Sequence, residues 1–499
     1  MNTLAGGRGS VTVRRSKPAL QAANVALCAI VLQSMEELLS LSATAQAALI
    51  RERQISSREL IEIHLAQIAR VNPRINAAVL VLAETALAEA RQADEALARA
   101  EAVGLLHGVP FSIKDSLELA GTVCTAGTLG RRGAAPSTED ATTVARLRQA
   151  GAIPIAKTNL PDLLFAFESD NLLFGKTCNP YDVSRTSGGS SGGEAALIAA
   201  CGSPLGLGSD AAGSVRVPAA FCGIASIKPT AGRLPRTGHF PPTGGWIERI
   251  WQIGPMARHV EDLWWAMRLL VWGDGRDATV IDMPLERSMV MLGNLRLAFY
   301  TDNGIAAATA EVCDVVRRAA RALEPDTAAV GEARPACLAQ AYDLEMKLLG
   351  ADGGDGLRDY LKHLGSTRLH PLLAAWLDKL ECYRTDLGGF AQYWAEVDAY
   401  CAEMLAFLGQ FDVILCPAYT QPALPHGTST LDENFRGFSH TMAYNVAGWP
   451  TSVVRCGESA DGLPIAVQVV AAPFREDIVL AVARRLEEAF GGWKAPTLT

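Results

Sequence analysis

Residues 186–218 constrain this chain more than any other stretch, because they place two serines in glycine-dense turns. The stretch reads TSGGSSGGEAALIAACGSPLGLGSDAAGSVRVP, and Ser190 and Ser214 lie 24 residues apart in it. An apolar helical run at 194–201 and a short apolar strand at 204–207 separate the two turns. Glycine lets the backbone approach a ligand closely, and a turn that opens a helix points free N–H groups at it. The pattern predicts two hydroxyls and several amides around one point, as acyl transfer requires.

A base for this chemistry is predicted upstream, where residues 107–115 read HGVPFSIKD. Val109, Phe111 and Ile113 alternate with more polar residues, which predicts a buried strand with Lys114 at its end. Burial disfavours the charged form of lysine, so its pKa falls from about 10.4 towards neutral pH. The residues therefore predict that Lys114 takes a proton through Ser190 while Ser214 attacks.

Further motifs follow in order along nearly the whole chain. They are GVPFSIKD at 108–115, NPY at 179–181, GGSSGGE at 188–194, GSDAAGSVRVPAAFCG at 208–223, KPTAGR at 228–233, IGPMAR at 253–258, DVILCPA at 412–418, YNVAGWP at 444–450 and GLPIAVQVV at 462–470. A string of this length is far more specific than one short motif. From about residue 36 to its last helix, the chain resembles the amidase signature family of serine hydrolases.

The resemblance implies a Ser–cisSer–Lys triad with Ser214 as nucleophile, Ser190 as the cis-serine and Lys114 as base. It also implies that the backbone of Leu164 lines the acyl site, and that Ser191, Asp210 and Arg216 support the loop. No metal or organic cofactor is implied. The implied oxyanion hole consists of the backbone amides of Ala211, Ala212, Gly213 and Ser214.

One residue of that loop departs from the family pattern, because Ala212 stands where the family has glycine. If this position had a positive φ, the methyl group would strain the backbone by ~1 kcal/mol or more. We therefore expect an altered shape near the scissile carbonyl.

The alternation of short apolar strands with helices after residue 108 predicts an α/β fold. The resemblance implies a large, twisted, mixed β-sheet with helices on both faces. We expect residues 35–499 to form a single domain, with a mostly helical, cap-like insertion at about 303–410. The aromatic residues in that insertion, including Trp376, are predicted to pack helices together rather than to contact a ligand.

The first 34 residues do not fit this pattern. Two arginines precede a short apolar run at 25–32, which has the outline of an export signal without a clear cleavage site. We expect 1–34 to be a disordered extension of a cytoplasmic protein.

Composition argues against several other classes of protein. The net charge is −8 and no basic block occurs, which argues against nucleic-acid binding. The chain has no apolar run of 18 residues, so no membrane span is predicted. Eleven scattered cysteines without a metal-ligand spacing indicate buried thiols, and the chain is expected to be a monomer or homodimer that acts on a small-molecule amide.

Two other motifs compete with the acyl-transfer hypothesis. Residues 188–192 fit the G-x-S-x-G nucleophile elbow, but the preceding DVSRTS is too polar for the buried strand that an elbow needs. Residues 206–211 fit a loose dinucleotide fingerprint, but the acidic residue that should follow is missing. A catalytically inactive binding protein is the third class, and the intact lysine and serines argue against it.

Two branches of the family remain open. The A subunit of the tRNA-dependent amidotransferase carries Gln where Val217 stands here, and the segment 235–242 with Trp246 and Trp251 is closer to the fatty acid amide hydrolase-like branch. The sequence therefore favours a stand-alone hydrolase of apolar acyl or aryl amides, with esters and carbamates as further substrates. The amidotransferase component is the alternative.

Overall fold

The computed structural model describes residues 35–242, 245–285 and 290–497. By internal contacts the chain divides into residues 1–38 and residues 39–499. Only 35–38 of the first part are described, and they begin helix α2 (Met35–Ser40). The prediction for residues 1–34 therefore lies outside the described residues. Residues 39–499 contain the sheet and the candidate site.

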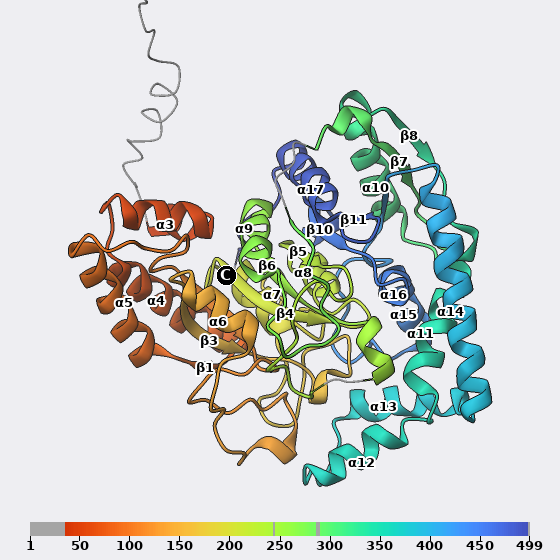
Figure 1. Ribbon diagram of the computed structural model, residues 1–499, viewed down its shortest axis with the longest axis horizontal. Coiled ribbons are helices and arrows are strands. Elements are labelled where there is room, and N and C mark those ends of the chain that lie inside the picture. The colour runs from red at the N-terminus through yellow and green to blue at the C-terminus, as the bar shows by residue number, and fades with distance from the viewer. Residues whose placement is uncertain (1–34, 243–244, 286–289, 498–499) are drawn as a thin grey trace, which may run out of the picture. The chain divides into compact units, whose positions relative to one another are not determined.

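An 11-stranded mixed sheet organises residues 39–499, with the order β1-β3-β2-β4-β6-β5-β10-β11-β9-β7-β8 (Figure 1). Strands β3, β2 and β4 run parallel to one another, as do β9, β7 and β8, and the central pairs are antiparallel. The strands are β1 (Ala78–Val81), β2 (Pro110–Lys114), β3 (Ile153–Thr158), β4 (Leu205–Asp210), β5 (Ala225–Lys228), β6 (Gln252–Ala257), β7 (Arg296–Phe299), β8 (Ala329–Glu332), β9 (Val413–Pro417), β10 (Thr451–Glu458) and β11 (Pro464–Ala471).

Helices cover both faces of this sheet, as the burial of its strands requires. Every residue of β2 to β6, β9 and β11 is buried, so neither face of the central sheet meets solvent. The helices after α2 are α3 (Ala43–Arg51), α4 (Ser57–Ile75), α5 (Ala83–Ala98), α6 (Thr142–Gln149), α7 (Gly192–Ala199), α8 (Arg216–Cys222), α9 (Val260–Leu270), α10 (Ala310–Leu323), α11 (Ala341–Gly350), α12 (Asp355–His363), α13 (Pro371–Leu380), α14 (Leu387–Leu408), α15 (Asp432–Phe435), α16 (Ser439–Val446) and α17 (Glu476–Phe490). The α/β fold predicted from the sequence is confirmed.

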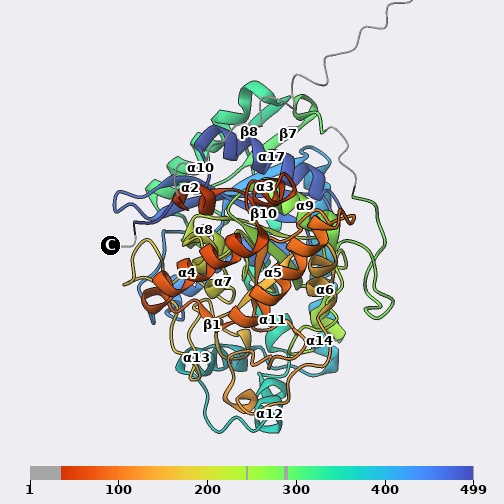
Figure 2. The same ribbon diagram turned by 90° about the vertical axis from the view of Figure 1, so that its left-hand side faces the viewer.

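Two groups of helices pack on the sheet. Helices α7 and α8 contact each other, α7 contacts β2 and β4, and α8 contacts β5, β10 and β11. Helix α17 contacts α9, α10, β10 and β11. Helices α4 and α5 pair with each other, and α4 also packs on α7 (Figure 2). The glycine-rich helix α7 is therefore enclosed between the sheet and α4.

The predicted insertion at 303–410 differs from its expected boundaries. Strand β8 pairs with β7 at the edge of the sheet, and α10 packs on β7, β9 and β11, so both belong to the sheet layer. Helices α11, α13 and α14 lie on the right of Figure 1, and α11 contacts both of the others. The helices that pack mainly on other helices thus begin near Ala341, where α11 also packs on α16, because the apolar face of α10 is buried against the strands.

Helix α4 begins with a capping box. Ser56 Oγ accepts from the Glu59 amide, and the Glu59 carboxylate accepts from the Ser56 amide. The helix continues through Pro73 and closes at Asn76 in a left-handed conformation. No helix in the described part of the chain is long and apolar enough to cross a membrane.

Candidate active site

The candidate site lies where β2 and β4 end. These strands are parallel neighbours, with Ser112 opposite Gly206 and Ile113 opposite Leu207. Their carboxyl ends therefore meet at one edge, where ligands of α/β sheets commonly bind. Strand β2 ends at Lys114 and β4 at Asp210, so the two predicted elements deliver their residues side by side.

Lys114 is fully buried and points to the first glycine-rich turn. Its Nζ lies 2.7 Å from Ser190 Oγ, 3.1 Å from Ser209 Oγ and 3.3 Å from the Ser209 carbonyl oxygen. Burial lowers the pKa of Lys114 to about 7, although the carboxylates of Asp210 and Glu194 act in the opposite direction. A lysine of this kind can exchange a proton near neutral pH.

The turn that carries Ser190 is fixed by its backbone and by the next serine. The peptide bond between Gly189 and Ser190 is cis, as the resemblance implies for this serine. Ser191 Oγ donates to the Ser209 carbonyl oxygen at 3.2 Å, and the Ser191 amide donates to the Ser214 carbonyl oxygen at 3.1 Å. Ser191 therefore ties the first turn to the second.

The second turn, after β4, places its unusual backbone at Gly213 and not at Ala212. Gly213 has φ 131°, in the region that favours glycine, whereas Ala212 is not among the residues with positive φ. A Cβ on Gly213 would lie 2.3 Å from Thr441 Oγ1. The strain expected for Ala212 is therefore absent, because the position that needs glycine is still glycine.

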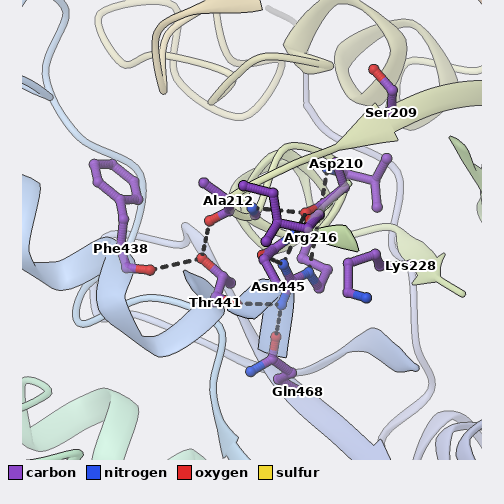
Figure 3. A network of polar contacts seen from close by, with 12 residues as sticks. Ser209, Asp210, Ala212, Arg216, Lys228, Phe438, Thr441, Asn445 and Gln468 are labelled. Atoms are coloured by element: carbon purple, nitrogen blue, oxygen red, sulfur yellow. Dashed lines mark hydrogen bonds and ion pairs between the residues drawn. The ribbon is translucent and has the colours of Figure 1, made fainter. Parts of the chain in front are cut away.

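A buried polar network holds this turn from behind. The Asp210 carboxylate accepts from the amides of Gly213 (2.8 Å) and Val215 (3.0 Å) and pairs with the Arg216 guanidinium. Asp210 therefore supports the turn both by an ion pair and by capping its backbone amides. Arg216 also donates to the Thr441 carbonyl at 2.9 Å, to Gln468 Oε1 at 2.8 Å and to Asn445 Oδ1. Figure 3 shows Asp210, Arg216 and Asn445 gathered at the centre of this network.

This network changes the predicted set of oxyanion donors. The Gly213 amide is engaged by Asp210, so it supplies the turn and is not a free donor. The amides of Ala211, Ala212 and Ser214 have no acceptor among the described residues. Three of the four predicted donors are therefore available to a ligand oxygen. The Ser214 hydroxyl likewise has no hydrogen-bond partner within the described ranges, and it forms none with Ser190 in this structure.

A largely apolar cavity of about 90 Å³ opens beside the two serines. A water needs about 10–15 Å³ of such space, so there is room for about six to nine water-sized groups, a range that includes the eight non-hydrogen atoms of a benzoyl group. Leu164, in the left-handed conformation at φ 69°, lines the cavity as the resemblance implies. The residues that line it are Leu163, Leu164, Phe165, Ala166, Phe167, Ser190, Ser209, Asp210, Ala211, Ala212, Ser214, His239, Pro241, Ile247, Trp251, Leu349 and Trp376.

The chemistry of this lining is nearly free of charge. Asp210 is the one charged side chain among the described residues that line the cavity, and its carboxylate is fully paired. Trp376 packs against Phe167, with ring centroids 5.0 Å apart, as the packing prediction expects, and it also lines the cavity. In the described part of the chain no group of His, Cys, Asp and Glu side chains could hold a metal ion.

Two residues of the site were not predicted from the sequence. Ser209 contacts Lys114, and His239 Nε2 lies 3.1 Å from Ser209 Oγ. His239 stands 30 residues after Ser209 in the sequence, and no local pattern around it predicts that it lies near Lys114. Its neighbours Phe240 and Pro241 belong to a segment that is recognisable in the sequence only as aromatic and proline-rich.

Glu194, at the start of α7, is a further buried carboxyl group near Lys114. It accepts hydrogen bonds from Ser112 and, at 2.7 Å, from Thr158 Oγ1. Burial raises the pKa of Glu194 to about 7, against the effects of these hydrogen bonds and of Lys114. This group anchors α7 to β2 and β3 beneath the site.

Comparison with known proteins identifies the family of this chain. The family model described as Amidase matches residues 59–480. Fatty-acid amide hydrolase 2 of Homo sapiens is 32% identical over 498 residues, covering 92% of this chain and 91% of the relative. The A subunit of glutamyl-tRNA(Gln) amidotransferase from Picosynechococcus sp. is 30% identical over 475 residues, covering 89% and 96%. A solved structure of 6-aminohexanoate cyclic dimer hydrolase, complexed with substrate, is 28% identical with a TM-score of 0.81, covering 92% of this chain and 99% of that one.

The family match spans most of the chain, and the motifs on which the resemblance rests are those that build the site at the ends of β2 and β4. The similar proteins include amide hydrolases at both the sequence and the structural level. The chain therefore belongs to the amidase signature family and is an amidase.

Proposed function

We propose that this amidase hydrolyses small, uncharged apolar or aryl amides through an acyl-enzyme on Ser214. The observation that carries the proposal is the buried contact of 2.7 Å between Lys114 Nζ and Ser190 Oγ, next to a small apolar cavity that Ser214 also lines. Ser190 and Ser214 line the same cavity, so a base, a relay hydroxyl and a nucleophile belong to one site.

The first half of the proposed reaction forms the acyl-enzyme. Neutral Lys114 takes the hydroxyl proton of Ser190 as Ser190 takes that of Ser214, and Ser214 Oγ bonds to the amide carbon. The amides of Ala211 and Ala212 stabilise the negative charge that develops on the carbonyl oxygen. The proton returns through Ser190 to the leaving nitrogen, the C–N bond breaks and the amine departs.

The second half regenerates the enzyme. A water enters the position left by the amine and gives a proton to Ser190, which passes one to Lys114. The water oxygen bonds to the acyl carbon, the bond to Ser214 Oγ breaks, and the proton returns to Ser214. The products are a carboxylic acid and an amine, and the same steps cleave esters and carbamates.

The test of this function is modification by a fluorophosphonate probe, followed by mass spectrometry of the tagged peptide and a panel of neutral anilides. We expect the tag on Ser214, and turnover of acetyl, butyryl and benzoyl anilides. A tag on Ser190 would favour the nucleophile elbow instead. Absence of both a tag and turnover would contradict the proposed hydrolase.

The amidotransferase component remains a second candidate, because the Picosynechococcus relative covers this chain nearly as fully as the hydrolase does. An amidotransferase takes its ammonia from an amide donor, and a donor with the charges of an amino acid would need charged side chains near the scissile bond. The described residues that line the cavity include no lysine or arginine, which favours an uncharged substrate. Amide turnover by the purified chain alone, without co-purifying partner proteins, would decide for the stand-alone hydrolase.

The rate should depend on pH through Lys114. Because the base is active when neutral and its pKa lies at about 7, kcat/KM should rise as pH increases through 7. Below that value the rate should fall about tenfold per pH unit. The measurement is kcat/KM for a neutral anilide between pH 5.5 and 9. A profile that is flat across pH 7 would argue against a titrating Lys114.

The acyl preference should depend on Trp376, which closes one wall of the cavity. In Trp376→Leu we expect kcat/KM for longer acyl anilides to increase relative to kcat/KM for the acetyl anilide. The increase should be up to about fourfold for each additional methylene that the enlarged cavity admits. The measurement is kcat/KM across a C2 to C12 series. Trp264→Leu is the matched control, because Trp264 is also buried, on α9, but does not line the cavity. If the dependence of kcat/KM on acyl chain length is the same in Trp376→Leu as in the wild type, the prediction that Trp376 limits the acyl group is wrong.

A further inference from the structure

The direction of the hydrogen bonds around Lys114 is not set by Lys114 itself. A neutral lysine has two N–H donors and one lone pair, and its Nζ has three neighbouring oxygens. The Ser209 carbonyl oxygen can only accept, so it takes one N–H. The other N–H and the lone pair are shared between the hydroxyls of Ser190 and Ser209, and either hydroxyl can donate. Only a lone pair directed at Ser190 makes Lys114 a base for Ser190.

His239 supplies the missing constraint. Its Nδ1 lies 3.2 Å from the Pro241 carbonyl oxygen, which can only accept, so Nδ1 carries the proton. In the neutral ring Nε2 is then an acceptor, and the neighbour at 3.1 Å is Ser209 Oγ. Ser209 therefore donates its hydroxyl proton to His239 and can only accept from Lys114.

We infer that His239 is a positioning residue for the proposed relay: by engaging the Ser209 hydroxyl proton, it turns the lone pair of Lys114 towards Ser190. The inference rests on the proposed function, in which Lys114 is the base. His239 touches neither the nucleophile nor the relay serine by hydrogen bond, and it acts through Ser209.

The surroundings hold the ring in the state that this role needs. Burial lowers the pKa of His239 to about 3, and the charges of Lys114 and Arg236 act in the same direction. The Trp251 ring packs against the imidazole at 4.5 Å between centroids, and the Arg236 guanidinium lies over Trp251 at 5.1 Å. The ring is therefore neutral across the working range of pH, and its tautomer is fixed by the Pro241 carbonyl.

Removing the His239 acceptor should change both the rate and the pH at which the rate falls. In His239→Leu the Ser209 hydroxyl is free to donate to the lone pair of Lys114, in competition with Ser190. This competition should lower the rate. The Ser209 oxygen, no longer polarised by donation to His239, also accepts less strongly from the N–H of protonated Lys114, so the acid limb of the pH profile should move to lower pH. A residue with only a structural role would lower the rate without moving the limb.

The experiment measures the rate constant of Ser214 modification by the fluorophosphonate against pH in the full chain. The variants are His239→Leu, His239→Gln, Ser209→Ala and the double variant His239→Leu/Ser209→Ala. In His239→Leu we expect a loss of about tenfold, the effect of one misdirected hydrogen bond in a relay, with the limb moved to lower pH. His239→Gln should recover most of the rate, because its side-chain oxygen can accept from Ser209.

The double variant makes the test specific. In the Ser209→Ala background no hydroxyl remains to be directed, so adding His239→Leu should change neither the rate nor the limb. An equal loss in both backgrounds, or a limb that does not move in His239→Leu, would overturn the inference while leaving the proposed function intact. Failure of the wild-type chain to be modified at Ser214 would overturn both.

Discussion

Ser214→Ala should lose amide turnover by on the order of 10⁴-fold or more, the size of effect seen when a nucleophile that works as a unit with its base is removed. The physical reason is that, among the described residues that line the cavity, Ser214 is the hydroxyl that follows the Ala211 and Ala212 amides in the turn, and these amides and its own amide lack an acceptor. Ser214 Oγ makes no hydrogen bond with another described residue, so its removal leaves no partner unsatisfied. Stability should therefore change by no more than about 0.5 kcal/mol.

The measurements are single-turnover kinetics with a neutral anilide and thermal unfolding of the same sample. Ser203→Ala is the matched control, because Ser203 precedes β4, is fully buried and donates to the Leu205 carbonyl oxygen, at the opposite end of the strand from the site. That control should keep wild-type turnover. If Ser214→Ala keeps its fold and still hydrolyses the anilide, Ser214 is not the nucleophile.

Local patterns predicted the conformation around the candidate residues, because this conformation depends on their immediate neighbours. Lys114 lies at the end of a strand with every residue buried, as the alternation at 109–113 indicates. The turns at 188–192 and 211–214 precede α7 and α8 as expected from their glycines and the apolar runs that follow. The conformation of such a motif depends on its own residues, so it can be predicted from a single sequence.

The order of the strands could not be predicted from the sequence, because it depends on contacts between distant segments. Strand β6 lies at the centre of the sheet between β4 and β5, yet it contains Gly254 and Pro255, which are depleted in strands. Burial between two helical layers overrides that preference. Strand β4 likewise continues three residues beyond the predicted apolar run, since its end pairs with β6.

The same limit explains why His239 and the walls of the cavity were missed. Asn445 and Gln468 lie within motifs that carry the family resemblance, but only the structure brings them to Arg216. Trp376 belongs to a helix far along the chain from Ser214, and its place in the cavity follows from packing against Phe167. Residues that act by proximity across the fold leave no local signal in one sequence.

Arg216→Met should be the most destabilising of these single substitutions, because Arg216 is fully buried and holds four partners together. Its loss leaves the Asp210 carboxylate buried without its counter-ion. Arg216 holds the pKa of Asp210 well below its usual range, after the opposing effect of burial. Since a lowered carboxylate pKa stabilises the fold above about pH 4, the contribution is fully present at neutral pH. We expect a loss of about 3–5 kcal/mol at pH 7.

The measurement is denaturant unfolding, with thermal inactivation rates where unfolding is irreversible. Arg58→Met is the matched control: the Arg58–Glu62 pair is half-exposed on α4, and its removal should cost no more than about 1 kcal/mol. The loss of stability in Arg216→Lys should lie between the losses in Arg216→Met and Arg58→Met. The lysine ammonium keeps the positive charge but cannot donate to Asp210, Asn445 and Gln468 at once. A loss in Arg216→Met no larger than that in Arg58→Met would mean that the turn carrying Ser214 holds its shape without the network behind it. The unusual backbone at Gly213 would then be set by its own sequence and by the contact with Thr441.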